Sequence, residues 1–328
     1  MRYTRQQILK EIGKSGQERL EKSSAAIVGL GALGSVSSEL LARAGIGKIL
    51  LIDRDVVELS NLQRQGIFEE SDIGKPKASA AWQHLKRINS EITIEFFIED
   101  LTCENISKIF SKRKNFDVIL DCTDNLETRF LLNDFCVKNK VPFIYSAAVG
   151  TRGYVFNVMP GSSACLRCFL KEPAQLETCE NTGVLNSITH LVSSVQANEA
   201  FKIILGRNYE KSLLFFDIWK NEFSKINANK NRNCICCAKN NFKYLDGKQS
   251  AGIAKLCGNN MYQIKAKPMG KKQFNILKNK LKKIGKVIDF SYCINFDGKI
   301  TVFEDGRALL KAKDEKEAKS VYSKFAGN

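Results

Sequence analysis

The chain has 328 residues, with 51 Lys and Arg against 35 Asp and Glu, and a net charge of +16. Hydrophobic residues make up 44% of it, enough for one large domain and something smaller. No apolar run reaches the length of a membrane span, and nothing resembles a signal peptide, so we expect a cytoplasmic protein with no membrane partner. In a reducing compartment its 11 cysteines indicate metal binding or chemistry before disulfides.

The positive charge is concentrated in the last third of the chain. Residues 206–328 contain 26 Lys and Arg and 11 Asp and Glu, a net charge of +15, whereas residues 1–205 contain 25 and 24 and carry +1. Such a surface suits an acidic protein partner or a nucleic acid, and a lysine-rich composition also simply keeps a protein in solution. Composition leaves these interpretations open.

An amphipathic helix pair is predicted at 4–22, interrupted near Gly13 and Gly16. It precedes the stretch 24–34, SAAIVGLGALG, in which an apolar strand pattern meets a glycine-rich turn and then a helical pattern.

In this context the glycines of the turn predict a nucleotide site. Gly29 allows the tight turn, Gly31 lets a phosphate approach the backbone, and Gly34 lets the helix pack on the strand. The helix N-terminus then attracts the anion. The alternative is a glycine turn that only helps packing, and the motif alone does not separate NAD from ATP.

A second predicted strand, 48–53, ends in Asp53, where an acid can bind a ribose hydroxyl. The long polar loop 53–77 follows, at the carboxyl edge of the sheet. Cations beside a glycine turn would neutralise a triphosphate, which a dehydrogenase does not need. A solvated charged loop is the alternative. The loop's candidate residues are Asp53, Asp55, Asn61, Arg64, Gln65 and Lys77.

Strands and helices alternate up to about residue 150, which predicts an α/β fold with a doubly wound, mostly parallel Rossmann-like sheet. Added antiparallel strands are predicted beyond that point. A helix should start near residue 75 and another should cover 188–206. The further strands are expected at 93–98, 116–122, 142–148, 151–160, 212–219 and 222–228.

The last part of the chain has an apolar pattern of its own. Residues 258–328 predict strand, helix, strand, strand and helix. We therefore divide the chain into a large domain at 1–250 and a small basic α+β domain at 251–328.

Two C-x-x-C pairs are separated by a long insert. Cys165 and Cys168 form the first pair, and Cys234 and Cys237 form the second, in which Cys236 obscures which sulfur atoms bind. Four thiolates so paired suit a structural, tetrahedral Zn²⁺ site. Buried or incidental cysteines are the alternative.

The strand at 116–122 leads into Asp124, again at the carboxyl edge. A carboxylate here, opposite Arg and Lys, is a suitable Mg²⁺ ligand. Asp124 as the N-cap of the next helix is an alternative, and the two roles are compatible.

Several motifs together resemble the ThiF/MoeB/HesA family of ubiquitin-activating-enzyme-like adenylyltransferases. They are YTRQ (3–6), SNLQRQ (60–65), IGKPKA (73–78), CTDN (122–125) and the paired C-x-x-C. The resemblance covers about residues 2–245. It implies Mg·ATP-dependent adenylation of the C-terminal glycine of a ubiquitin-like sulfur carrier by a homodimer.

The resemblance also implies roles for individual residues. The glycines would line the nucleotide, with Asp53 at the ribose and Asp124 on Mg²⁺. Arg5 would reach the ATP of the partner protomer. The phosphates would be contacted by Arg64, Gln65 and Lys77, assisted by Asn61.

Cys179 matches a cysteine that, in some relatives, forms a thioester or an acyl-disulfide with the carrier. Such a role needs a thiolate, whereas the neighbours Glu177 and Glu180 would raise its pKa. A loop cysteine not needed for adenylation is the alternative.

The leading interpretation is adenylation of a MoaD/ThiS-type carrier with a C-terminal Gly-Gly. It would serve molybdopterin, thiamine or tRNA thiolation, or ubiquitin-like conjugation. A tRNA-modifying adenylating dehydratase of the same fold is the alternative, and an NAD-dependent oxidoreductase is disfavoured by Arg64, Lys77 and Asp124. Nucleic acid therefore remains a possible partner. We further hypothesise that the basic domain docks an acidic carrier or a sulfur donor.

Overall fold

The computed structural model describes residues 2–111, 116–170, 182–247, 253–255, 261–264 and 269–326. The chain divides into two units, one of residues 1–73 and 77–249, the other of residues 74–76 and 250–328. Each unit has its own sheet.

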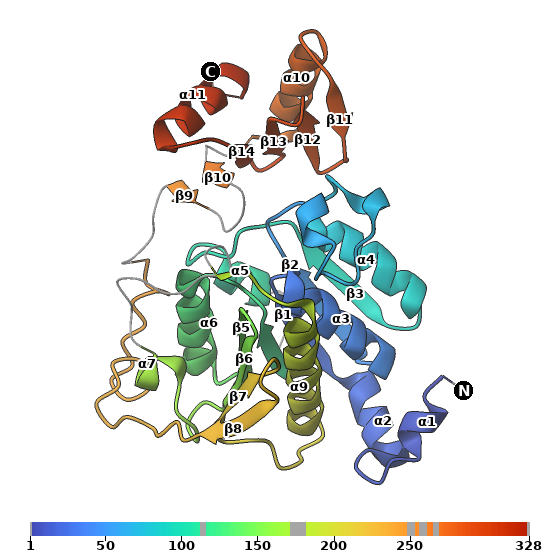
Figure 1. The fold of residues 1–328 in the computed structure, drawn as a ribbon, viewed down its shortest axis with the longest axis vertical. Helices are drawn as coiled ribbons and strands as arrows, with labels where there is room; N and C mark the ends of the chain where they lie inside the picture. Colours follow the sequence, from blue (N-terminus) through green and yellow to red (C-terminus); the bar gives the residue numbers. More distant parts are fainter. Residues whose placement is uncertain are drawn as a thin grey trace. The chain divides into compact units, whose positions relative to one another are not determined.

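The large unit is built on an eight-stranded sheet with the order β3-β2-β1-β4-β5-β6-β7-β8 (Figure 1). Its first five strands are parallel. The chain moves outward from β1 on both sides, so β1 and β4 flank the switch point at which doubly wound sheets bind ligands. These strands are β1 (Ser24–Val28), β2 (Lys48–Ile52), β3 (Thr93–Phe97), β4 (Val118–Asp121) and β5 (Phe143–Val149).

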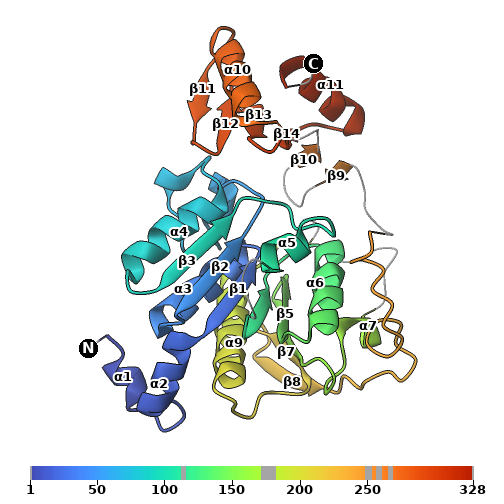
Figure 2. The same cartoon turned by 180° about the vertical axis from the view of Figure 1, so that it is seen from behind.

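Helices cover both faces of this sheet, as Figures 1 and 2 show. One core cluster contains side chains of α3, α4 and α9, and the other contains side chains of α5 and α6. Because both faces are covered, the central strands are apolar throughout rather than alternating. The helices are α3 (Ala32–Ala44), α4 (Lys77–Ile88), α5 (Ile106–Ser111), α6 (Leu126–Asn139) and α9 (Asn186–Ile204).

Antiparallel strands extend the sheet beyond β5, as the alternating pattern predicted. They are β6 (Arg152–Val158), β7 (Leu213–Asp217) and β8 (Glu222–Ile226), and α7 (Leu166–Phe169) follows β6. Every residue of the edge strand β8 is exposed. The central sheet is therefore mostly parallel with added antiparallel strands.

Two helices precede β1, α1 (Thr4–Gln7) and α2 (Gly13–Lys22). Gly13 begins α2, but the predicted interruption at Gly16 is wrong. Gly16 lies inside the helix, where a Cβ would come within 3.2 Å of the Ile12 side chain and 3.3 Å of Leu205. The glycine thus permits close packing and does not break the helix.

The small unit contains a six-stranded antiparallel sheet with the order β11-β12-β13-β14-β10-β9. Side chains of α10 and α11 contribute to its separate apolar core. The elements are β9 (Ile253–Lys255), β10 (Met261–Ile264), α10 (Lys271–Lys282), β11 (Val287–Asp289), β12 (Cys293–Phe296), β13 (Ile300–Phe303), β14 (Ala308–Lys311) and α11 (Glu315–Phe325).

Between α10 and α11 there are four strands. The prediction of two strands in this part of the chain is wrong. The strands are only three or four residues long, and tight turns join them. Asp297 and Gly298 both have positive φ between β12 and β13, and Gly306 has a φ of +85° before β14. Asp-Gly pairs at 297–298 and 305–306 are hairpin signals, so the sequence did contain this information.

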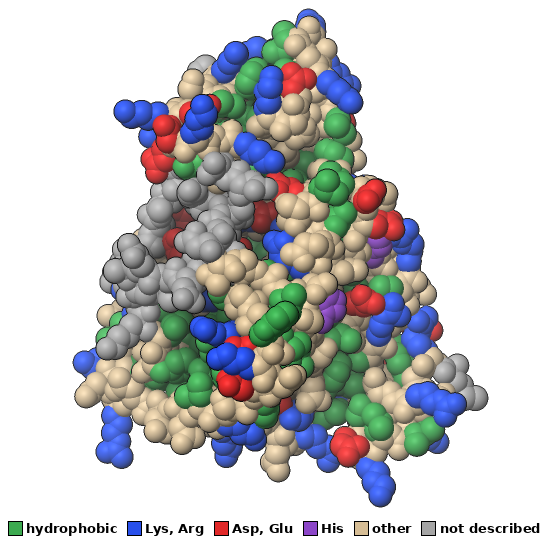
Figure 3. Space-filling model, in the orientation of Figure 1, with side chains coloured by type: hydrophobic (Ala, Val, Ile, Leu, Met, Phe, Trp, Pro, Cys, Tyr) green, Lys and Arg blue, Asp and Glu red, His purple; other side chains and the backbone are tan. Residues whose placement is uncertain are grey.

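The described helices include none that is both long and apolar enough to cross a membrane. Figure 3 shows Lys and Arg side chains spread over the visible surface of the small unit and not gathered in one patch. The positive charge on this face of the small unit is therefore dispersed.

Candidate nucleotide site and cysteine cluster

The glycine turn connects β1 to α3. A Cβ at Gly29, whose φ is +87°, would lie 2.7 Å from the Cys122 carbonyl oxygen, and a Cβ at Gly34 would lie 1.8 Å from the Gly29 carbonyl oxygen. Neighbouring backbone therefore excludes a side chain at both positions. At Gly31 the nearest atom would be Gln65 Nε2, 3.8 Å away. Two glycines thus shape the turn, and the third leaves space beside the N-terminus of α3.

Asp53, just after β2, is 8% exposed. Its Oδ2 accepts a hydrogen bond from the Leu30 N–H at 2.5 Å, and its Oδ1 accepts one from the Asp55 N–H at 2.7 Å. Burial raises the pKa of Asp53, and the Lys77 charge opposes that shift. The carboxylate predicted to bind a ribose hydroxyl therefore also holds the glycine turn in place.

Lys77, the first residue of α4, brings a positive charge to these acids. It is 7% exposed, and its Nζ lies 3.4 Å from Asp55 Oδ2. Burial alone would lower the pKa of Lys77, but Asp55, Asp53 and Asp124 outweigh burial and raise it. The ammonium group is therefore fully charged at neutral pH.

Arg54 is a second cation at this edge, which the sequence analysis did not single out. Its Nη1 lies 3.0 Å from Asp100 Oδ1, and its Nε lies 3.8 Å from Asp55 Oδ1. Burial lowers the pKa of Arg54, but Asp55, Asp100 and Asp124 raise it by more. The sequence does place Arg54 between two acids at the end of β2, and this pattern could have marked it as a candidate. Its ion pair with Asp100 depends on tertiary structure.

The loop after β2 contains three more predicted residues, and one of them, Gln65, lies beside Gly31. Asn61 ends the short helix η1 (Leu59–Asn61), and its carbonyl oxygen accepts the backbone N–H groups of Arg64 and Gln65. Arg64 Nη1 donates to the Ser60 carbonyl oxygen at 2.9 Å. Gln65 is 3% exposed, and its Oε1 has no hydrogen-bond partner in the described part of the chain. A buried free acceptor beside the open space at Gly31 suits a donor group of a ligand.

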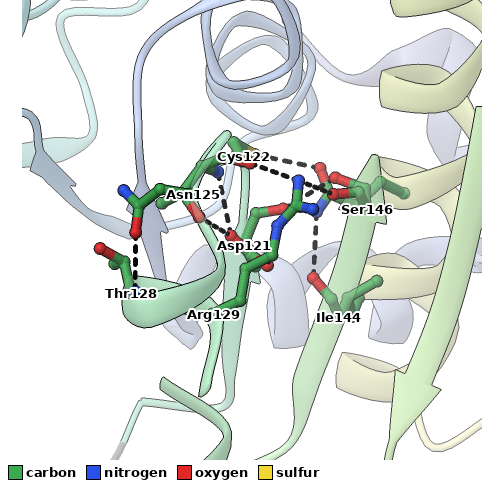
Figure 4. Close-up of polar contacts among 9 residues, drawn as sticks. Asp121, Cys122, Asn125, Thr128, Arg129, Ile144 and Ser146 are labelled. Atoms are coloured by element: carbon green, nitrogen blue, oxygen red, sulfur yellow. Dashed lines mark hydrogen bonds and ion pairs between the residues drawn. The ribbon is translucent and has the colours of Figure 1, made fainter. Parts of the chain in front are cut away.

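The turn after β4 presents Asp124 to the same region (Figure 4 shows the residues around it). Asp124 is exposed, and its charge raises the pKa of both Arg54 and Lys77. The alternative role as a helix cap is wrong, because Asn125 caps α6 by accepting the Thr128 N–H at 2.8 Å. The side chain of Asp124 is therefore not used as the cap of α6.

Two predicted residues are not brought to this group. Arg5 is exposed on α1, whose preceding residues Arg2 and Tyr3 contact Ile88 and Asn89 at the C-terminal end of α4, whereas Lys77 begins that helix. Cys179 lies outside the described residues.

The four cysteines of the two C-x-x-C pairs converge from segments far apart in sequence. Their Sγ atoms all lie within 4.8 Å of one another, with 3.6 Å between Cys165 and Cys234 and 3.5 Å between Cys168 and Cys237. A tetrahedral Zn²⁺ with Zn–S bonds of about 2.3 Å places its sulfur atoms about 3.8 Å apart. The arrangement of these cysteines fits that geometry.

Cys236 is placed outside this group of four. Its Sγ accepts a hydrogen bond from Asn133 Nδ2 at 3.3 Å. The Asn133 Oδ1 accepts a hydrogen bond from the backbone N–H of Leu166, so Asn133 connects α6 to both cysteine segments. Cys236 is thus not one of the four mutually close sulfur atoms, which spacing alone did not decide.

The family model of the ThiF family matches residues 3–237. The chain belongs to this family. A relative from Bacillus subtilis (strain 168), "Sulfur carrier protein ThiS adenylyltransferase", is 39% identical over 99% of both chains. The family prediction is confirmed, and this ThiF-family chain aligns with that relative through its small unit as well.

Other relatives share the large unit. "Adenylyltransferase and sulfurtransferase MOCS3" from Culex quinquefasciatus is 39% identical over 73% of this chain, which spans 55% of that protein. "SAMP-activating enzyme E1" from Haloferax volcanii is 34% identical over 73% of this chain and 88% of the relative. The Escherichia coli MccB structure with MccA-N7isoASN has a TM-score of 0.64 at 23% identity, over 72% of this chain and 75% of MccB. That likeness confirms the α/β fold.

Proposed function

We propose that this chain uses ATP to adenylate the C-terminal glycine of a small ubiquitin-like sulfur carrier of the ThiS or MoaD type. The observation that carries the proposal is the grouping of Lys77, Asp53, Asp55 and Asp124 beside the open space at Gly31. The names of three relatives support it, since each describes an adenylyltransferase or an activating enzyme. The ThiS relative, similar over its whole length, makes a ThiS-type carrier the first substrate to test.

The proposed reaction needs positioning and charge neutralisation more than a general base. The carrier's terminal carboxylate is ionised at pH 7, and one of its oxygens attacks the α-phosphorus of ATP. The bond between the α-phosphorus and the bridging oxygen breaks, and pyrophosphate leaves with that oxygen and its electron pair. The products are an acyl-adenylate and pyrophosphate.

Each residue of the site has a part in this reaction. The N-terminus of α3 at Gly31 would bind phosphate oxygens, and Asp53 would accept a hydrogen bond from a ribose hydroxyl. Lys77 and Arg64 would neutralise the triphosphate, with Gln65 and Asn61 positioning it.

Two metal ions complete the proposal. Asp124, exposed beside Lys77, would bind Mg²⁺, which neutralises phosphate charge. The group of four cysteines would bind a structural Zn²⁺ and fix the segment after β6 to the segment at 234–237.

We also propose a homodimer in which Arg5 of each protomer reaches the nucleotide of the other, since the residues just before α1 contact the C-terminal end of α4 in their own chain, the end opposite to Lys77. Residues 1–250 would form the adenylation domain, and residues 251–328 a separate basic domain that docks an acidic carrier or a sulfur donor. Charge reversal at the exposed Lys280 of α10 and at Lys283, the C-cap of that helix, tests the second idea. If the KM for the carrier at low salt does not change, the small unit does not dock the carrier.

Carrier-dependent exchange of pyrophosphate into ATP is the decisive experiment. The full-length protein should catalyse exchange with a ThiS-type carrier ending in Gly-Gly and not with the same carrier lacking that glycine pair. Arg64→Ala should abolish exchange. Cys179→Ala should preserve it, because a covalent role for the thiol would come after adenylation, in carrier transfer or conjugation.

The alternatives give different results in the same assay. If no Gly-Gly carrier supports exchange but a tRNA substrate promotes ATP turnover, the chain is an adenylating dehydratase. Binding of NAD in place of ATP would indicate an oxidoreductase, which the buried Lys77 beside the phosphate position disfavours. Either result would overturn the proposed function.

A further inference from the structure

The turn that presents Asp124 is held by a buried ion pair that no proposed step uses. Asp121 Oδ1 accepts hydrogen bonds from the Thr123 backbone N–H at 2.9 Å and from its hydroxyl at 2.7 Å. Arg129 Nη2 donates to the Thr123 carbonyl oxygen at 2.5 Å (Figure 4). The backbone donor and the backbone acceptor of Thr123 are therefore both engaged by this pair.

The pair is itself fixed to the neighbouring strand. Asp121 is 0% exposed, and its Oδ2 lies 3.5 Å from Arg129 Nε. Arg129 also donates to the Ser146 carbonyl oxygen at 3.2 Å and lies 5.1 Å from the centre of the Tyr145 ring. Ser146 Oγ donates to the Asp121 carbonyl oxygen at 2.7 Å. A buried ion pair adds little net stability, so positioning a neighbouring group is the better reason for one here.

Asp124 lies between two residues that are both fixed. Thr123 is fixed by the ion pair, and Asn125 is fixed as the cap of α6. The carboxylate of Asp124 acts electrostatically on Arg54 and Lys77 across the site. Its location is therefore set by neighbours in the chain.

We infer that Arg129 and Asp121 are positioning residues for the divalent-cation ligand Asp124. The inference rests on the proposed function, which assigns Mg²⁺ to Asp124. The ion pair holds the turn so that the Asp124 carboxylate faces the triphosphate before cation and nucleotide bind. Without the pair, the turn has to be ordered during binding, which weakens the affinity for the cation.

The test measures cation binding directly. Mn²⁺ is titrated into the full-length protein with a non-hydrolysable ATP analogue, and free Mn²⁺ is followed by electron paramagnetic resonance. Arg129→Lys keeps the charge but loses the forked contacts, and we expect Mn²⁺ to bind about tenfold more weakly, the effect typical of outer-shell partners of a metal site. Asp121→Asn keeps an acceptor for Thr123 without the charge, and we expect a smaller loss of Mn²⁺ affinity.

Two further variants separate the possible outcomes. Leu132→Ala, on α6 and fully buried, should lower the thermal midpoint and leave Mn²⁺ affinity unchanged, because the hydrogen bonds of Thr123 to Asp121 and Arg129 do not involve Leu132. An equal loss of Mn²⁺ affinity in Leu132→Ala and Arg129→Lys would overturn the positioning role. If Asp124→Ala binds Mn²⁺ like the wild type, the proposed cation ligand is wrong. Weak binding by Asp124→Ala together with wild-type binding by Arg129→Lys and Asp121→Asn would overturn the inference alone.

Discussion

The nucleotide edge of the sheet and the cysteine cluster are both assembled from segments distant in sequence, but they are held together differently. At the edge, the Asp53 carboxylate accepts hydrogen bonds from two backbone N–H groups, and the negative charges of neighbouring acids balance the positive charge of Lys77. In the cluster, sulfur atoms of like character face one another at 3.5–4.0 Å. The edge is therefore organised by the protein's own groups, whereas in the cluster the proposed Zn²⁺ would hold the four sulfur atoms together.

The largest expected effect is at the edge. Lys77→Ala should lower carrier-dependent pyrophosphate exchange by about 10²–10³-fold, because it removes the buried cation from the phosphate position. Lys86→Ala on the same helix, whose Nζ donates to the carbonyl oxygens of Ser90 and Ile92, is the matched control. A similar loss in both variants would mean that the effect is damage to α4.

Metal removal is the corresponding change in the cluster. Cys234→Ser should abolish bound zinc and lower the thermal midpoint by about 10 °C, since the ion's binding free energy contributes to folding. Cys236→Ser should keep one zinc per chain. Elemental analysis and calorimetry measure both quantities, and full zinc content in Cys234→Ser would contradict the ligand assignment.

A pair of glycine substitutions tests how the edge is organised. Gly34→Ala should destabilise the protein by about 3 kcal/mol or prevent folding, because its Cβ meets the Gly29 carbonyl oxygen. Gly31→Ala should unfold like the wild type but bind ATP about tenfold more weakly, because the methyl group enters the space left for phosphate. Denaturant unfolding and nucleotide titration check the two variants. Normal ATP affinity in Gly31→Ala would place the nucleotide elsewhere.

The smallest expected effect concerns pH. The folded pKa of Lys77 is raised above its usual 10.5, so the pairing with Asp55 is fully present below pH 10.5 and is lost as the pH rises through the higher value. Asp55→Asn removes the largest cause of that rise and leaves burial, which lowers the pKa. ATP-analogue binding should therefore weaken at a lower pH than in the wild type. Asp100→Asn, which faces the non-titrating Arg54, should leave that midpoint unchanged.

Much of the fold and part of the site could be predicted from the sequence. The glycine turn, the strands of the large unit and the candidate cysteine pairs follow from local patterns, and the structure brings Asp53, Asp55, Lys77 and Asp124 together as expected. The roles of Arg54, Arg129 and Asp121 did not follow, because their partners are on other strands or loops. Three strands of the small unit were not predicted, β9 and two of the four between α10 and α11, because strands of three or four residues are too short to show an alternation.

The sequence by itself determined the family, the succession of strands and helices along the large unit and the residue types at the carboxyl edge, because these depend on backbone rules over a few neighbouring residues. Tertiary structure decided the remaining assignments. In the folded chain Asn125, not Asp124, caps α6, and Cys236 accepts a hydrogen bond from Asn133. Asp53 accepts a hydrogen bond from the backbone of the glycine turn. The physical reason is that a polar side chain takes the partner that strand order and helix packing bring within hydrogen-bond distance, and spacing along the chain does not contain that information.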